Sequence, residues 1–164
     1  MRSADPRPTL PLRWTSRAAA PQDAASIAAH RFDERPAPAE AVARYAAWLR
    51  PRIADGRYLG RLADADGRVI AGAGAVLLDW GPRRDSGPAH LLARINNVYV
   101  DPAWRRRGIA RALLQQVLAE CRSRGIVYAT LAATADGAGL YRGLGFTAKP
   151  DEMTLRLDAP PHAA

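Results

Sequence analysis

A run of three arginines and a glycine, Arg105, Arg106, Arg107 and Gly108, is the part of this sequence best suited to chemistry. It stands at the expected start of a helix, where backbone N–H groups lack internal acceptors and the helix dipole adds partial positive charge. Gly108 and Ala110 have little or no side chain, so a diphosphate can reach these amides while the guanidinium groups supply charge at the rim. The run therefore predicts an anion site, although a basic run before a helix is also a common solvated surface.

A strand and a helix must position this run. Residues 91–100 are predicted to form the strand, and a turn at residues 101–102 leads into the arginines. Residues 108–122 form the clearest predicted helix, which Gly125 ends. Its apolar stripe consists of Ala110, Leu113, Leu114, Val117, Leu118 and Cys121. A buried type of strand follows at residues 126–132, so the strand–helix–strand unit predicts a parallel pair inside a mixed sheet.

The rest of the chain supplies further strands and helices. Residues 58–63 and 68–78 are predicted to form a hairpin around a tight turn at residues 64–67. The other elements are expected at residues 10–15 (strand), 21–31 and 39–50 (helices), about 136–144 (short helix) and 153–157 (strand). Pro51 is expected to end or kink the second helix.

Two motifs in this chain resemble those of the GNAT family, the GCN5-related N-acetyltransferases. Residues 97–114 closely resemble its acetyl-CoA-binding motif, Gln/Arg-x-x-Gly-x-Gly/Ala, which Arg105, Gly108 and Ala110 fit in register. Residues 140–146, Leu-Tyr-Arg-Gly-Leu-Gly-Phe, look like the family signature Leu-Tyr-x-x-x-Gly-Phe. Two motifs in the right order and at the right interval are more specific than either alone. By the order of its elements, the resemblance extends to the whole chain.

The resemblance implies a mixed α/β (α+β) fold, in which about four helices flank a central mixed, mostly antiparallel sheet that is splayed at its middle. It implies transfer of an acetyl group from acetyl-CoA to a primary amine by direct attack in a ternary complex. The pantetheine arm would pair with strand backbone like an added strand. The cofactor contacts implied are Val98, Tyr99, Val100, Arg105, Arg106, Arg107, Gly108, Ile109, Ala110 and Thr134. Tyr141 matches the tyrosine that often protonates the departing thiolate, its alternative role being helix packing.

Two positions depart from the family pattern. Thr134 stands where many relatives carry an asparagine, and Arg94 stands where relatives often carry a glutamate as general base. An amine is mostly protonated at neutral pH, so some group must accept its proton. The candidates are water relayed along Asn96 or Asn97, and His90, which has a suitable pKa range but is more often structural. The base is therefore left unassigned.

The acceptor site of the family is lined by two loops, which here are residues 32–39 and 147–152. Their carboxylates suit a cationic amine, or simply solubility: Asp33, Glu34, Asp151 and Glu152. Three tryptophans suit a pocket floor, or ordinary packing: Trp48, Trp80 and Trp104. The expected acceptor is a small-molecule or peptide amine of unassigned identity. Family relatives are often homodimers, but the sequence carries no interface signature.

Length and composition limit the possible domain organisation, localisation and metal content. The 164 residues predict one domain over residues 1–164, with loose tails at 1–11 and 158–164. No stretch approaches the ~20 apolar residues of a membrane span, and we expect a cytoplasmic protein. The single cysteine, Cys121, excludes an intrachain disulfide and a cysteine metal cluster, and no metal is expected.

The net charge of +8 raises a nucleic-acid interpretation. Lys149 is the only lysine, so the charge is almost all arginine and indicates a compositional bias rather than a phosphate-binding surface. A basic nucleic-acid module therefore stays a remote alternative, and no nucleic-acid partner is expected. The nearer alternative is a non-catalytic acyl-CoA-binding sensor of the same fold.

Overall fold

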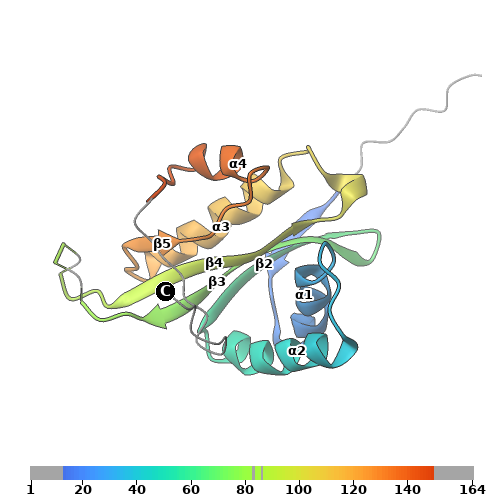
Figure 1. The fold of residues 1–164 in the computed structure, drawn as a ribbon, viewed down its shortest axis with the longest axis horizontal. Coiled ribbons are helices and arrows are strands. Elements are labelled where there is room, and N and C mark those ends of the chain that lie inside the picture. Colours follow the sequence, from blue (N-terminus) through green and yellow to red (C-terminus); the bar gives the residue numbers. More distant parts are fainter. Residues whose placement is uncertain (1–12, 83, 86, 150–164) are drawn as a thin grey trace, which may run out of the picture. The chain divides into compact units, whose positions relative to one another are not determined.

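A five-stranded sheet carries the segment that leads into the arginine run (Figure 1). The computed structural model describes residues 13–82, 84–85 and 87–149. The chain divides into two compact units, residues 1–132 and 133–164. Within the described residues, no helix is both long enough and apolar enough to cross a bilayer.

The sheet is mixed and mostly antiparallel, as the sequence predicts. Its strands are β1 (Thr15–Ala18), β2 (Tyr58–Ala65), β3 (Arg68–Asp79), β4 (Leu91–Val100) and β5 (Tyr128–Thr130), in that spatial order. Neighbours from β1 to β4 pair antiparallel, whereas β4 and β5 pair parallel and confirm the expected parallel pair. Asp66 and Gly67 join β2 to β3 with φ of 50° and 77°, the positive values that a type I′ hairpin turn requires.

Helices cover both faces of this sheet (Figure 1). The short 3-10 turn η1 (Pro21–Asp23), α1 (Ala24–Arg31) and α2 (Ala39–Ala54) lie on one face, and α3 (Ile109–Ser123) lies on the other. The α1/α2 side has a core of Ala24, Ile27, Ala28, Ala46, Leu49, Tyr58, Leu62 and Val76. The stripe expected on α3 is buried at Leu113, Leu114, Val117, Leu118 and Cys121, so this helix is fixed against the sheet.

The second helix does not end at Pro51, so of the two expectations for this proline, an end or a kink, the end is wrong. Proline removes one N–H donor, but α2 continues through it to Ala54. The Nη1 of Arg52 donates to the carbonyl of Trp48 at 2.7 Å, and the N–H of Asp55 donates to the Pro51 carbonyl at 2.9 Å. Ile53 also packs against the core, so the last turn is held by contacts that the local sequence does not reveal.

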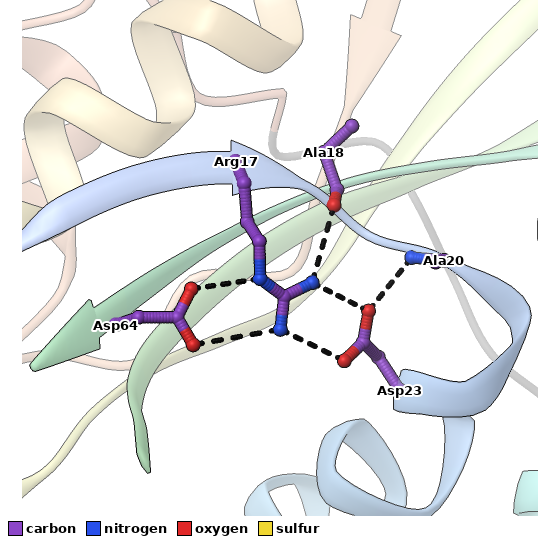
Figure 2. A network of polar contacts seen from close by, with 5 residues as sticks. All are labelled: Arg17, Ala18, Ala20, Asp23 and Asp64. Atoms are coloured by element: carbon purple, nitrogen blue, oxygen red, sulfur yellow. Dashed lines mark hydrogen bonds and ion pairs between the residues drawn. The ribbon is translucent and has the colours of Figure 1, made fainter. Parts of the chain in front are cut away.

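An arginine of β1 joins this strand to η1 and to β2 (Figure 2). Arg17 of β1 lies between two carboxylates, with its Nη1 2.7 Å from Asp23 and its Nε 2.8 Å from Asp64 of β2. Asp23 also accepts the N–H of Ala20 at 2.7 Å. The pKa of Asp23 is lowered, chiefly by Arg17 and against the opposing effect of burial. This network holds the N-terminal end of α1, the helix that carries His30 and Arg31.

Several predicted boundaries move. The strand predicted at residues 10–15 overlaps β1 only at Thr15, and residues 10–12 of that prediction lie outside the described residues. β5 is shorter than the predicted strand at 126–132. The predicted strand at 153–157 lies outside the described residues. In the second unit, the predicted short helix is α4 (Ala138–Arg142).

Candidate functional site

The sheet parts between β4 and β5. Their parallel pairing covers Leu92 to Arg94 on β4 and ends at the pair Arg94 and Thr130. From Ile95 onward, β4 pairs with no other strand of the described residues on that side. The backbone of Val98, Tyr99 and Val100 therefore lies beyond the point of separation, where an extended ligand can add to the strand edge. This is the splayed sheet that the resemblance to the GNAT family implies.

A β-bulge bends β4 just past this point. Gly72 and Gly74 of β3 pair with Tyr99 and Asn96 of β4, so β4 has one extra residue between them. Asn97 lies in this extra length with a φ of 52°, a left-handed conformation that asparagine tolerates better than most residues.

Hydrogen bonds from the α1/α2 side hold Asn97 in this conformation. Its Nδ2 donates to the hydroxyl oxygens of Tyr45 at 2.9 Å and Tyr58 at 3.1 Å. Its Oδ1 accepts from the Nη1 of Arg31 at 3.2 Å. Burial strongly raises the pKa of Tyr58, so this phenol stays protonated at neutral pH. A relay of water along Asn97 is less favoured by this arrangement, because both side-chain atoms are already engaged.

The arginine run forms an exposed loop with free backbone donors. Asp101 begins the loop by accepting the N–H of Ala103 at the 3-10 turn η2 (Pro102–Trp104). Arg106 and Gly108 have φ of 64° and 77°, and a Cβ on Gly108 would meet nothing within 4 Å. Within the described residues, no N–H group of residues 106–110 donates a hydrogen bond. Such a row of amides at a helix N-terminus is suited to an anion.

The three arginine side chains differ in what they contact. Arg105 donates from Nε to the carbonyl of Val100 at 3.1 Å and from Nη2 to Glu34 at 2.9 Å. The guanidinium of Arg107 lies 5.8 Å from the ring centre of Trp104. Arg106 forms no hydrogen bond or ion pair with the described part of the chain. Arg106 is therefore the side chain most available to a phosphate, a ranking that the sequence does not provide.

Tyr141 and Thr134 both lie in the second unit. Thr134 Oγ1 accepts the N–H of Gly137 at 3.2 Å, so its hydroxyl supports the start of α4. Burial raises the pKa of Tyr141, whose ring meets that of Phe146 edge-on at 6.0 Å. Gly145, with φ of 93°, reverses the chain, and the N–H of Phe146 then donates to the Tyr141 carbonyl at 3.0 Å. This turn explains the spacing of the Leu-Tyr-x-x-x-Gly-Phe signature.

Sequence reasoning missed His30 and named Asn96 only as a candidate water relay, and both lie on the α1/α2 side of β4. His30 stacks on Tyr99 with ring centres 4.2 Å apart, and burial lowers the pKa of its imidazole. Asn96 lies opposite Gly74, on the face where Tyr58 packs. Its Oδ1 is buried and has no hydrogen-bond partner within the described residues. The only sequence signal for His30 is its place at the end of a helix.

The other residues considered for the base or the acceptor are dispersed. His90 is exposed just before β4, about 20 Å along the strand from Asn96 at ~3.3 Å per residue. Glu34 is engaged with Arg105 rather than free for a cationic amine. Trp104 is buried, whereas Trp48 and Trp80 are exposed. Asp151 and Glu152 lie outside the described residues.

The chain belongs to the acetyltransferase (GNAT) family, whose model matches residues 23–146. It is 35% identical over 111 residues to the [ribosomal protein bS18]-alanine N-acetyltransferase of Salmonella typhimurium. That alignment covers 65% of this chain and 64% of the relative, so the match spans slightly less than two thirds of the relative's length.

Solved structures show the same fold. A GCN5-related N-acetyltransferase from Ralstonia eutropha JMP134 superposes with a TM-score of 0.78 at 34% identity, covering 90% of this chain and 100% of that one. An acetyltransferase from Clostridium acetobutylicum, solved with acetyl-CoA, has a TM-score of 0.79 at 23% identity, covering 88% and 97%. At that identity the second likeness concerns the fold alone.

Proposed function

We propose that this protein transfers an acetyl group from acetyl-CoA to a primary amine. The observation that carries the proposal is the segment of residues 106–110, which leads into the N-terminus of α3. Its backbone N–H groups have no acceptor in the described chain. Such donors suit the diphosphate of coenzyme A. The structural neighbour from Clostridium acetobutylicum, solved with acetyl-CoA, supports this choice of cofactor.

In this proposal the cofactor follows the free edge of β4. The diphosphate lies on the amides of Arg106 to Ala110, with Arg106 as the available guanidinium, and the pantetheine arm pairs along Val98 to Val100. Beyond Arg94 the edge of β4 that faced β5 has no strand partner within the described residues, which fits this role. We also propose the single domain predicted over residues 1–164, and we place the protein in the cytoplasm.

The reaction needs an amine held for attack on the thioester carbon. An N–C bond forms, the C–S bond breaks, and its electron pair leaves on sulfur. The nitrogen loses one proton to water, and the thiolate gains one from the Tyr141 phenol, which solvent then reprotonates. Asn96 Oδ1, a buried acceptor without a donor in the described chain, receives an N–H of the incoming amine. The Salmonella relative is named as a [ribosomal protein bS18]-alanine N-acetyltransferase, which supports an amine acceptor.

Calorimetric titration with acetyl-CoA tests the cofactor site. The double variant Arg105→Ala/Gly108→Glu places a carboxylate among the loop amides and should lose binding that the wild type shows. Gly67→Glu is the matched control, because Gly67 has the same φ of 77° and equally open surroundings in the β2–β3 turn. Equal binding by wild type and double variant would contradict the proposed site.

Thiol release distinguishes an enzyme from a sensor. A catalytic protein releases free coenzyme A from acetyl-CoA in the presence of an amine acceptor, whereas a sensor binds the cofactor without turnover. The absence of a carboxylate at position 94 keeps the sensor as the second candidate. Binding without thiol release across a broad amine panel would favour it.

A further inference from the structure

An arginine lies at the fork where the sheet opens. Arg94 is opposite Val76 and therefore shares the face of the sheet that α1 and α2 cover. Its Nη1 donates to the Thr130 hydroxyl at 3.3 Å, across the last pair of β4 and β5. Within the described residues, this half-buried guanidinium has no carboxylate partner. By contrast, the half-buried Arg61 on the opposite face pairs with Glu120 at 3.0 Å.

A second arginine reaches the same strand from α1. Arg31 donates to Asn97 Oδ1 at 3.2 Å, and its guanidinium lies over the rings of Tyr45 at 4.6 Å and Phe32 at 5.9 Å. It also has no carboxylate partner in the part of the chain that the structure describes. Arg94 and Arg31 therefore bring two uncompensated positive charges to one face of β4, on either side of Asn96, where an unsatisfied acceptor is buried.

Nearby carboxylates do not neutralise this face. Glu34 pairs with Arg105 at 2.9 Å, and Asp101 pairs with Arg68 at 3.1 Å. Burial, and after it the nearby Asp33, raises the pKa of the Tyr99 phenol, and Tyr99 lies about 17 Å along the strand from Arg94. Arg94 is half-buried whereas Arg31 is exposed, so the cost of desolvation applies to Arg94: a partly desolvated cation is stabilised by an anion, and within the described residues no carboxylate pairs with Arg94.

We propose that the acceptor is an amine whose own molecule also carries an anionic group, a carboxylate or a phosphate monoester, which Arg94 and Arg31 bind. The inference rests on the proposed acetyl transfer and specifies its substrate class. The two guanidinium groups attract the anion, and Asn96 Oδ1 between them receives the amine N–H. They also disfavour the ammonium form of the bound amine, because like charges lower the pKa of a cationic acid. The bound amine is thereby kept neutral and nucleophilic, although β4 carries no carboxylate that could act as a base beside it.

The test compares matched amines at low ionic strength and constant pH. The pairs are alanine with alaninamide and O-phosphoethanolamine with ethanolamine, and the measurement is thiol release from acetyl-CoA. In at least one pair, we expect the wild type to favour the amine with the anionic group over the matched amine without it, by at least about 10-fold in kcat/KM. Arg94→Gln and Arg31→Gln should each lower kcat/KM for that anionic amine by about 10-fold or more, mainly through KM, and change its partner by less than about 3-fold.

Two controls separate this inference from the proposed function. Arg44→Gln also removes one positive charge, but from an exposed position of α2, and should leave every ratio unchanged. Titration with acetyl-CoA should give the same affinity for wild type, Arg94→Gln and Arg31→Gln, which also shows that the variants fold.

The outcomes divide as follows. The inference is supported if the wild type binds acetyl-CoA and prefers the anionic amine, and if Arg94→Gln abolishes that preference. Turnover that favours the uncharged-group partners, or binding of acetyl-CoA with no turnover of either anionic amine, overturns the substrate class and leaves the cofactor site standing. Absence of acetyl-CoA binding overturns the proposed function itself, and the inference with it.

Discussion

The Nδ2 of Asn97, on β4, donates a hydrogen bond at 3.1 Å to the phenol oxygen of Tyr58, on β2, two strands away. The phenol reaches across the intervening strand because Gly74 has no side chain: a Cβ there would lie 2.0 Å from the Tyr58 oxygen. The bond helps to hold Asn97 at its positive φ, so a glycine of β3 and a tyrosine of β2 together fix the bulge in β4.

Gly74→Ala should therefore destabilise the protein and disturb the bulge. The added methyl group must displace the buried ring of Tyr58, and overpacking of this kind costs about 1–3 kcal/mol. Urea unfolding measures the loss, and the affinity for acetyl-CoA should fall with it because Asn97 loses a partner. Gly139→Ala is the control, since a Cβ on Gly139 meets nothing within 4 Å. A loss below 0.5 kcal/mol for Gly74→Ala, within the ~0.5 kcal/mol usual for neutral changes, would contradict this account.

Local patterns were sufficient for the elements that carry the cofactor motif. The structure confirms the strand at residues 91–100 at both ends, and α3 begins one residue from the predicted start. Apolar periodicity decides these elements, and Gly125 has the positive φ that ends a helix. The resemblance to the GNAT family, drawn from the two motifs, is also confirmed.

Long-range partners could not be predicted in this way. The bulge at Asn97 depends on its register against Gly72 and Gly74, which only the paired sheet defines. The ion pair of Arg105 with Glu34 joins residues 71 positions apart and decides which arginine of the run is free. Periodicity is a property of one segment, so it carries no information about contacts between segments.

Arg17→Gln should lower the free energy of unfolding by about 1–3 kcal/mol. Breaking a buried ion pair costs about 3–5 kcal/mol, and the estimate is reduced because the Arg17 side chain is 42% exposed. The pKa of Asp23 is lowered below its usual 3.8, so the ionised carboxylate stabilises the fold above that pH. The stabilisation should disappear as the pH falls through the lowered pKa, and the difference between wild type and Arg17→Gln should shrink there.

An exposed ion pair serves as the control for this prediction. Arg44 and Glu40 lie 3.8 Å apart with side chains 72% and 78% exposed. Arg44→Gln should change the free energy of unfolding by less than about 0.5 kcal/mol. Equal effects of the two substitutions would show that the network in Figure 2 does not anchor α1.

His30 should make stability depend on pH between neutrality and mildly acidic conditions. Burial lowers the pKa of its imidazole below 6.5, and the nearby Asp33 and Asp101 only partly oppose this. Below pH 6.5 the unfolded chain therefore binds more protons than the folded one, and stability falls as the pH drops. His30→Phe keeps an aromatic ring against Tyr99 and should remove this part of the dependence.

Unfolding at pH 7.5 and pH 5.5 provides the measurement. The difference between the two pH values should be smaller in His30→Phe than in the wild type. A histidine resonance assigned to His30 that titrates above pH 6.5 would refute the lowered pKa and with it the prediction.

Tyr141→Phe should separate catalysis from binding. Burial raises the pKa of the phenol above its ordinary 10, so the group keeps its proton throughout neutral pH and can give it to a leaving thiolate. Loss of one general acid typically costs about 10²–10⁴ in rate, and we expect kcat to fall by about 10²-fold. The affinity for acetyl-CoA should stay within about 2-fold, because the ring and its contact with Phe146 are retained.

The pH profile distinguishes this role from packing. Because the pKa is raised, Tyr141 should cause no decline in wild-type kcat below pH 10, and any basic limb above that value should be missing from Tyr141→Phe. Tyr128→Phe removes a phenol whose partner is Asp85, in the β3–β4 loop, and should leave kcat unchanged. If Tyr141→Phe loses stability and cofactor affinity together while kcat is preserved, the tyrosine serves the fold of its own unit, and the proton for the thiolate must come from elsewhere.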